Sequence, residues 1–162
     1  VFDHRHAGQD PAVVGRHDDP QATTLTASHD GYAAAFGLVH ERDLRLSRDG
    51  ARLDGEDRLT QPARRPAGPA DVECAIRFHL YPGVQAMRIE ENAVLLTLPG
   101  GERFRFEAGL PASIEESVFF ASPQGPRACE QIVLRARSGD MSTVVWSLAR
   151  TGDALSTDCD GS

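Results

Sequence analysis

The chain has 162 residues, of which 40% are hydrophobic and 25% charged, and its 24 acidic against 17 basic residues give a formal net charge of −7. This length suffices for one domain with a hydrophobic core, and no run of about 18 apolar residues is present that would span a membrane. The acidic balance argues against nucleic-acid binding, which depends on a basic surface. We therefore expect one globular domain with neither nucleic acid nor a membrane as partner.

The two ends of the chain are polar. The first ten residues, VFDHRHAGQD, lack the apolar segment of a signal peptide, and the first residue is Val rather than Met, which is consistent with a fragment or a processed chain. We expect residues 1–21 to be a partly disordered N-terminal segment, with solvated histidines, and residues 151–162 to be a disordered tail. Residues 22–150 then form the predicted domain.

Alternation of hydrophobic and polar residues, and in residues 93–98 a short continuous apolar run, predicts β-strands along most of the chain. In chain order the segments are LRLSR (44–48), ARLDGEDRL (51–59), VECAIRFHLYP (72–82), VQAMRIE (84–90), AVLLTL (93–98), GERFRFEA (101–108), RACEQIVLRAR (127–137) and MSTVVWSLAR (141–150). No stretch of about 12 residues has a clear helical period.

Turn residues separate these strands at short intervals. Asp49-Gly50 is a strong hairpin signal, Glu91-Asn92 and residues 99–101 (PGG) mark two further turns, and the proline-rich residues 61–71 predict an exposed crossover loop. The pattern predicts an all-β fold, an antiparallel β-sandwich of about ten strands with little or no helix.

The inward-facing strand positions predict the hydrophobic core. The residues expected to be mostly buried are Leu44, Leu46, Ile76, Phe78, Leu96, Phe104, Ile132, Leu134, Val144 and Trp146.

The segment SHDGYAAAFGLVHERDLRL (28–46) contains two histidines, His29 and His40. We expect it to form two strands and a connection. His40 alternates in phase with Arg42 and Leu44, which favours a hydrogen-bonded interior group over a metal ligand. His29 and Tyr32 flank an Asp-Gly turn. They are either a general base and a general acid, or Asp-Gly is only a turn and Tyr32 an amphipathic residue that packs beside it.

Eight motifs occur in a fixed order along the chain: SHDGY, FGLVHER, LDGEDRL, FHLYP, VLLTLPGGERFRF, EESVFF, EQIVL and VVWSLAR. Together they resemble the C-terminal region of heparinase II/III-like proteins, over roughly Thr24 to Arg150. That family joins an α/α-toroid to a large antiparallel β-sandwich and cleaves acidic polysaccharides by β-elimination, in which a base removes the C5 proton of a uronic acid and an acid protonates the leaving oxygen.

The resemblance implies where a lyase site would lie. In the family the catalytic Tyr belongs to the toroid and a catalytic His precedes the stretch that begins here, so no catalytic residue is assigned to this chain. Family members can hold zinc in the sandwich, and His29 matches the last ligand by its order along the chain. The family also suggests the periplasm or cell envelope, an acidic polysaccharide as substrate and a toroid domain as partner.

Two other functions stay open at this stage. One is a stand-alone carbohydrate-binding or structural β-sandwich module. The other is a small cupin-like metal enzyme using His29, His40 and His79, which requires the three histidines to face inward on adjacent strands. The apolar neighbours of His40 and the different, polar face of His79, shared with Arg77 and Glu73, argue against this last alternative.

Overall fold

The computed structural model describes residues 12–61, 72–123, 125–138 and 142–152. Within these ranges it contains eleven β-strands and one four-residue helix. The elements are β1 (Ala12–Asp18), β2 (Ala22–His29), α1 (Ala33–Phe36), β3 (Val39–Ser47), β4 (Arg52–Thr60), β5 (Glu73–His79), β6 (Gln85–Glu90), β7 (Ala93–Thr97), β8 (Arg103–Ala108), β9 (Ala112–Phe119), β10 (Arg127–Arg137) and β11 (Thr143–Arg150).

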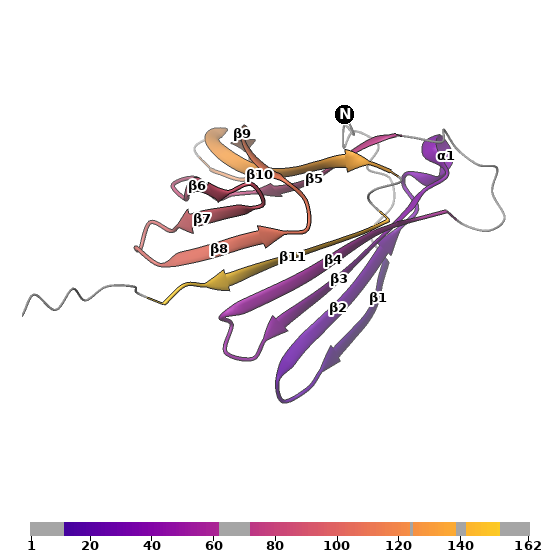
Figure 1. The fold of residues 1–162 in the computed structure, drawn as a ribbon, viewed down its shortest axis with the longest axis horizontal. Helices are drawn as coiled ribbons and strands as arrows, with labels where there is room; N and C mark the ends of the chain where they lie inside the picture. The colour runs from indigo at the N-terminus through magenta and orange to yellow at the C-terminus, as the bar shows by residue number, and fades with distance from the viewer. Residues whose placement is uncertain (1–11, 62–71, 124, 139–141, 153–162) are drawn as a thin grey trace, which may run out of the picture.

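The strands form two antiparallel sheets of unequal size (Figure 1). The large sheet has eight strands in the order β1-β2-β3-β4-β11-β8-β7-β6, and the small sheet has three in the order β5-β10-β9. The prediction of an all-β sandwich of about ten strands is confirmed. No helix among the described residues has the length and apolar character needed to cross a membrane.

The predicted hairpin turns are confirmed. Asp49-Gly50 joins β3 to β4, Glu91-Asn92 joins β6 to β7, and residues 98–102 join β7 to β8. Gly50 has a φ of 69°, a left-handed conformation that glycine adopts without a steric penalty. The predicted crossover loop, residues 61–71, lies outside the described residues except for its first position.

The hydrophobic core lies between the small sheet and one half of the large sheet. Its buried residues come from β5, β9 and β10 on one side and from β7, β8 and β11 on the other. Of the ten predicted core residues, six are buried and Leu44, Phe78 and Phe104 are partly buried against the core; the six are Ile76, Leu96, Ile132, Leu134, Val144 and Trp146.

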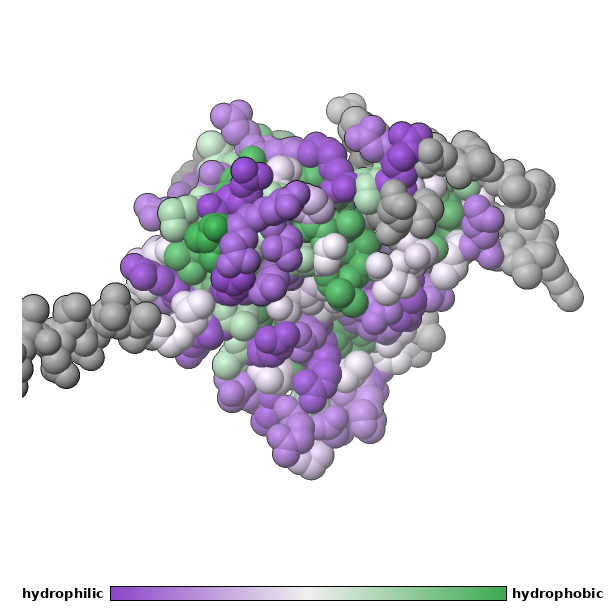
Figure 2. Space-filling view, in the orientation of Figure 1, coloured by the Kyte–Doolittle hydropathy of each residue, from purple (hydrophilic) through white to green (hydrophobic). Residues whose placement is uncertain are grey.

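The prediction for Leu46 is wrong, because its side chain is 44% exposed. Leu46 lies on β3, in the half of the large sheet that fans away from the small sheet in Figure 1. Its cross-strand neighbourhood includes Leu25 of β2, which is also 37% exposed. In Figure 2 hydrophobic residues are visible over the middle of the molecule, while its lower part, which carries the β1–β2 and β3–β4 hairpins, is mostly hydrophilic on this side. The inner face of the large sheet is therefore covered over one half and open over the other.

The N-terminal strand extends this open half. Residues 12–18 form β1, which pairs antiparallel with β2 and has an irregularity between Val13 and Gly15. The rest of the segment expected to be partly disordered, residues 1–11, lies outside the described residues, as does most of the C-terminal tail, residues 153–162.

Candidate functional site

The two histidines of the 28–46 segment lie directly opposite each other. His29 is the last residue of β2, His40 lies near the start of β3, and the antiparallel register pairs them. The chain between them forms α1, which ends at Gly37 with a φ of 68°. The segment is thus two strands and a connection, as predicted, with one helical turn in the connection. Register and turn together bring the rings within hydrogen-bond distance, with His40 Nδ1 lying 3.1 Å from His29 Nε2.

A buried carboxylate lies on the far side of His40. Asp57 of β4 is only 3% exposed, and its Oδ1 lies 2.7 Å from His40 Nε2. Arg42 donates from Nε to the same oxygen at 2.6 Å, and Trp146 donates from Nε1 to Oδ2 at 2.8 Å. Asp57 therefore accepts hydrogen bonds from three side chains on two neighbouring strands, β3 and β11.

These hydrogen bonds keep Asp57 ionised. Burial by itself disfavours the charged carboxylate, but the hydrogen bonds from His40, Arg42 and Trp146 and the charge of Arg42 outweigh it and hold the pKa of Asp57 below its ordinary value of 3.8. The Arg42 guanidinium also lies 5.8 Å from the Phe78 ring centroid and 5.9 Å from that of Trp146. These aromatic contacts and the ion pair hold Arg42 at the boundary between the core and the open half of the sheet.

The turn after β2 surrounds His29. The Tyr32 ring meets the His29 ring edge-on, with centroids 4.9 Å apart, and burial raises the pKa of the Tyr32 hydroxyl. A Cβ placed on Gly31 would lie 3.3 Å from His29 Nδ1, closer than most real Cβ contacts. Gly31 thus avoids a close contact with the His29 ring. His29, Tyr32, His40 and Asp57 form one continuous cluster, which we call the His29 cluster.

The described residues do not fit a zinc site. Among them, no three His, Cys, Asp or Glu side chains are grouped so that they could hold a metal ion. Zinc normally takes four ligands, of which His29 would supply one, while the nitrogens of His40 are directed to His29 and Asp57. No step of the chemistry is therefore assigned to a metal, and His29 as a metal ligand stays an implication of the resemblance.

The structure separates His79 from the other two histidines. His79 lies on β5 of the small sheet, is exposed, and its Nδ1 lies 2.9 Å from Ser117 Oγ. Its neighbour Phe78 faces the core instead, so His79 points away from it. The cupin-like arrangement of three inward-facing histidines is wrong. His40 is confirmed as a part-buried, hydrogen-bonded group.

Asp57, Arg42 and Trp146 were not predicted as parts of a site. The sequence held one signal for Asp57: in ARLDGEDRL it alternates in phase with Leu53 and Leu59, so an acidic residue occupies a face that is otherwise apolar. Buried carboxylates need partners, and Arg42 alternates in phase with His40 on the neighbouring strand. Trp146 comes from 89 residues further along the chain, and its contact with Asp57 has no local signal.

Comparison with known proteins identifies the family. The family model described as "Heparinase II/III-like, C-terminal" matches residues 2–147. The chain belongs to the heparinase II/III-like family. The resemblance of the eight motifs is confirmed by this match. No curated protein sequence matches this heparinase II/III-like chain.

Solved structures share the fold of this heparinase II/III-like chain. One, described as heparinase III, the BT4657 gene product, has a TM-score of 0.67 at 11% identity, over 88% of this chain and 22% of that chain. A second, the same product with methylated lysines, has a TM-score of 0.66 at 10% identity, over 88% and 21%. The chain spans about a fifth of the length of these proteins, and at such identities the likeness concerns the fold alone.

Proposed function

We propose that this chain is the C-terminal β-sandwich part of a polysaccharide lyase, which cleaves uronic-acid-containing polysaccharides by β-elimination and has its helical toroid elsewhere. The observation that carries the proposal is the family match over residues 2–147. The open half of the large sheet supports it, because Leu25 and Leu46 leave apolar surface there for another domain to cover.

The chemistry of elimination explains why a second domain is needed. A base must reach the C5 proton, an acid must protonate the leaving oxygen, and the uronate carboxylate must be neutralised. His29 and Tyr32 are groups of the required type, and they lie at the end of β2 and in the turn that follows it. A second wall is required to exclude water and to complete the site, and the family resemblance assigns the catalytic Tyr to the toroid.

The unsaturated uronate formed by β-elimination absorbs in the ultraviolet, so the test is direct. We expect the purified 162-residue chain to produce no such absorbance with heparin, heparan sulfate or alginate. A longer polypeptide that includes the helical domain should produce it with at least one of them, and His29→Ala should reduce that rate. His17→Ala, an exposed histidine on β1, is the matched control and should leave the rate unchanged.

Two results would count against the proposal. If the 162-residue chain itself produces the absorbance and His29→Ala abolishes it, the site is complete without a toroid. If the longer polypeptide cleaves none of the uronate polymers, the proposal of lyase activity is wrong.

A second candidate is a carbohydrate-binding module, favoured by exposed aromatic residues at one end of the small sheet. Tyr81 is 60% and Phe120 76% exposed, and the Tyr81 ring meets the Phe119 ring edge-on at 5.2 Å. Exposed aromatic faces offer apolar area on which sugar rings can pack. Affinity electrophoresis of the chain in gels containing these polysaccharides tests it: retardation that Tyr81→Ala removes would support a binding module.

A further inference from the structure

The hydrogen bonds of the His29 cluster have a direction that can be worked out from its buried end. Asp57 is ionised and can only accept, so the proton between Asp57 Oδ1 and His40 Nε2 belongs to His40. A neutral imidazole carries one N–H, so the other nitrogen of His40, Nδ1, has a lone pair and accepts. The proton between the two rings must then come from His29 Nε2.

We propose that His40 and Asp57 are positioning residues that hold neutral His29 in a single tautomer, with the proton on Nε2 and the lone pair on Nδ1. The consequence for catalysis or binding rests on the proposed function: with its Nε2 donating to His40, His29 can meet other groups as an acceptor only through Nδ1. His40 and Asp57 act only through His29.

Two further observations agree with this arrangement. Gly31 avoids the close contact that a Cβ, 3.3 Å from Nδ1, would make with the His29 ring. Arg42 already neutralises the charge of Asp57 through its 2.6 Å ion pair. The carboxylate therefore has its counter-charge from Arg42, and His40 needs to supply only a hydrogen bond.

The opposite direction is disfavoured by the geometry. If His40 donated from Nδ1 to His29 while neutral, its Nε2 lone pair would face the Asp57 carboxylate at 2.7 Å. A proton on Asp57 would remove that repulsion, but it would also neutralise the carboxylate and so weaken the ion pair between Asp57 and Arg42. The Trp146 indole and the Arg42 guanidinium can only donate hydrogen bonds, so neither can accept a hydrogen bond from a protonated Asp57.

Nitrogen NMR of the ¹⁵N-labelled 162-residue chain tests the proposal without any substitution. At neutral to mildly alkaline pH we expect the long-range ¹H–¹⁵N spectrum to show His29 protonated on Nε2 alone and His40 on Nε2 alone. A scalar coupling across the hydrogen bond should join His29 Nε2 to His40 Nδ1. A proton on His40 Nδ1, whether His40 is neutral or doubly protonated, would overturn the proposal, as would absence of the coupling.

Substitution at position 40 then tests positioning. In His40→Gln the amide offers one donor for Asp57 and one acceptor for His29, so His29 should keep a slowly exchanging Nε2–H. In His40→Leu the acceptor is lost, and the Nε2–H signal should disappear through exchange with water. An unchanged His29 signal in His40→Leu would show that His40 does not position it.

The exposed His79 on the small sheet is the internal reference, and its signals should be the same in all three chains. The wild-type spectrum decides the hydrogen-bond direction even if His40→Leu fails to fold. These spectra do not depend on catalysis, so a reversed hydrogen bond and a failed lyase assay are separate outcomes.

Discussion

The indole of Trp146 is positioned by the absence of a side chain at Gly55. The two residues face each other across β11 and β4, and a Cβ on Gly55 would lie 2.1 Å from Trp146 Cζ2. The ring therefore occupies the space that a side chain at position 55 would fill, and its Nε1 reaches Asp57 two residues further along. One glycine thus sets the position of both a core residue and a hydrogen-bond donor to the buried carboxylate.

We expect Gly55→Ala to lower the free energy of unfolding by about 1–3 kcal/mol or more, because the ring cannot move away without losing its packing and its hydrogen bond. A urea melt measures this change. Gly15→Ala is the matched control, since that strand glycine has nothing within 4 Å of its Cβ position. Equal stability of the two variants would contradict the close contact.

Removal of the indole tests the same contact from the other side. Trp146 is 7% exposed, and we expect Trp146→Ala to cost about 3–5 kcal/mol through the cavity and the lost partner of Asp57. In a Trp146→Ala background, Gly55→Ala should cost much less than in the wild type, because the clash is gone. A loss below about 1 kcal/mol in a denaturant melt of Trp146→Ala would place the ring outside the core.

At the scale of elements, the outer face of the small sheet is held by ion pairs across its strands. Glu115 of β9 accepts hydrogen bonds from Arg135 of β10 and lies 3.5 Å from Arg77 of β5. The hydrogen bond from Arg135, followed by the charge of Arg135 and smaller contributions from Ser113 and Arg77, lowers the pKa of Glu115 from 4.5 to about 2.

This depressed pKa makes stability depend on pH in a defined direction. The unfolded chain binds a proton at Glu115 near pH 4.5 and the folded chain only near about 2, so the stabilisation is present above 4.5 and is lost as the pH falls to about 2. We expect Glu115→Gln to lose less stability than the wild type over this interval. Denaturant melts at several pH values measure it, and parallel pH profiles would contradict the prediction. Glu116→Gln, exposed on the same strand, is the control.

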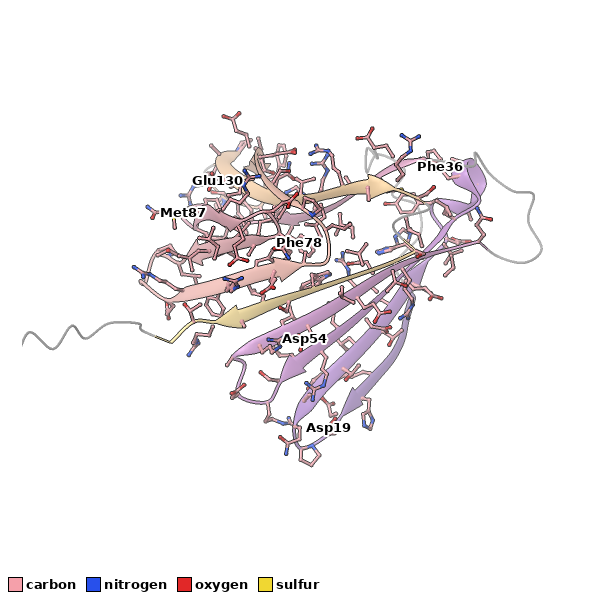
Figure 3. All side chains as sticks on the ribbon, in the orientation of Figure 1. Asp19, Phe36, Asp54, Phe78, Met87 and Glu130 are labelled. Carbon is pink, nitrogen blue, oxygen red and sulfur yellow. The ribbon has the colours of Figure 1, made fainter. Side chains whose placement is uncertain are left out.

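At the scale of the whole molecule, one aromatic side chain joins the two sheets. Phe78 of the small sheet lies between the layers (Figure 3), with ring centroids 4.9 Å from Phe106 and 4.8 Å from Trp146 of the large sheet. Because the small sheet has only three strands, its stability depends on this contact and on the aliphatic residues around it.

We expect Phe78→Ala to cost about 3–5 kcal/mol, because it removes the ring that both layers contact. Phe120→Ala is the matched control, since Phe120 is 76% exposed, and it should change stability by no more than about 0.5 kcal/mol. Thermal melts followed by Trp146 fluorescence and by circular dichroism report on the core and on the sheets. Similar losses in the two variants would show that Phe78 does not join the layers.

The sequence alone determined the local structure. The period-2 alternation around Phe78 and Trp146 gave the strands and the side chains that share a face, and Asp49-Gly50 placed a hairpin, because both signals depend only on neighbouring residues. Eight motifs in order were enough to indicate the family. The same local reasoning placed His40 on the inner face as a hydrogen-bonded group.

Only the tertiary structure decided which inner-facing positions are covered. Leu44 and Leu46 have the same alternation, yet Leu44 packs against the core whereas Leu46 is 44% exposed. The His29 cluster likewise depends on contacts 11 and 17 residues apart in the chain, and its Asp57 on a donor, Trp146, that is 89 residues away. The alternation of hydrophobic and polar residues shows on which side of a strand a side chain lies. Whether that side chain is buried, and which side chains it contacts, depends on the order of the strands and on the stacking of the sheets. Both arise from packing between segments that are distant in the chain.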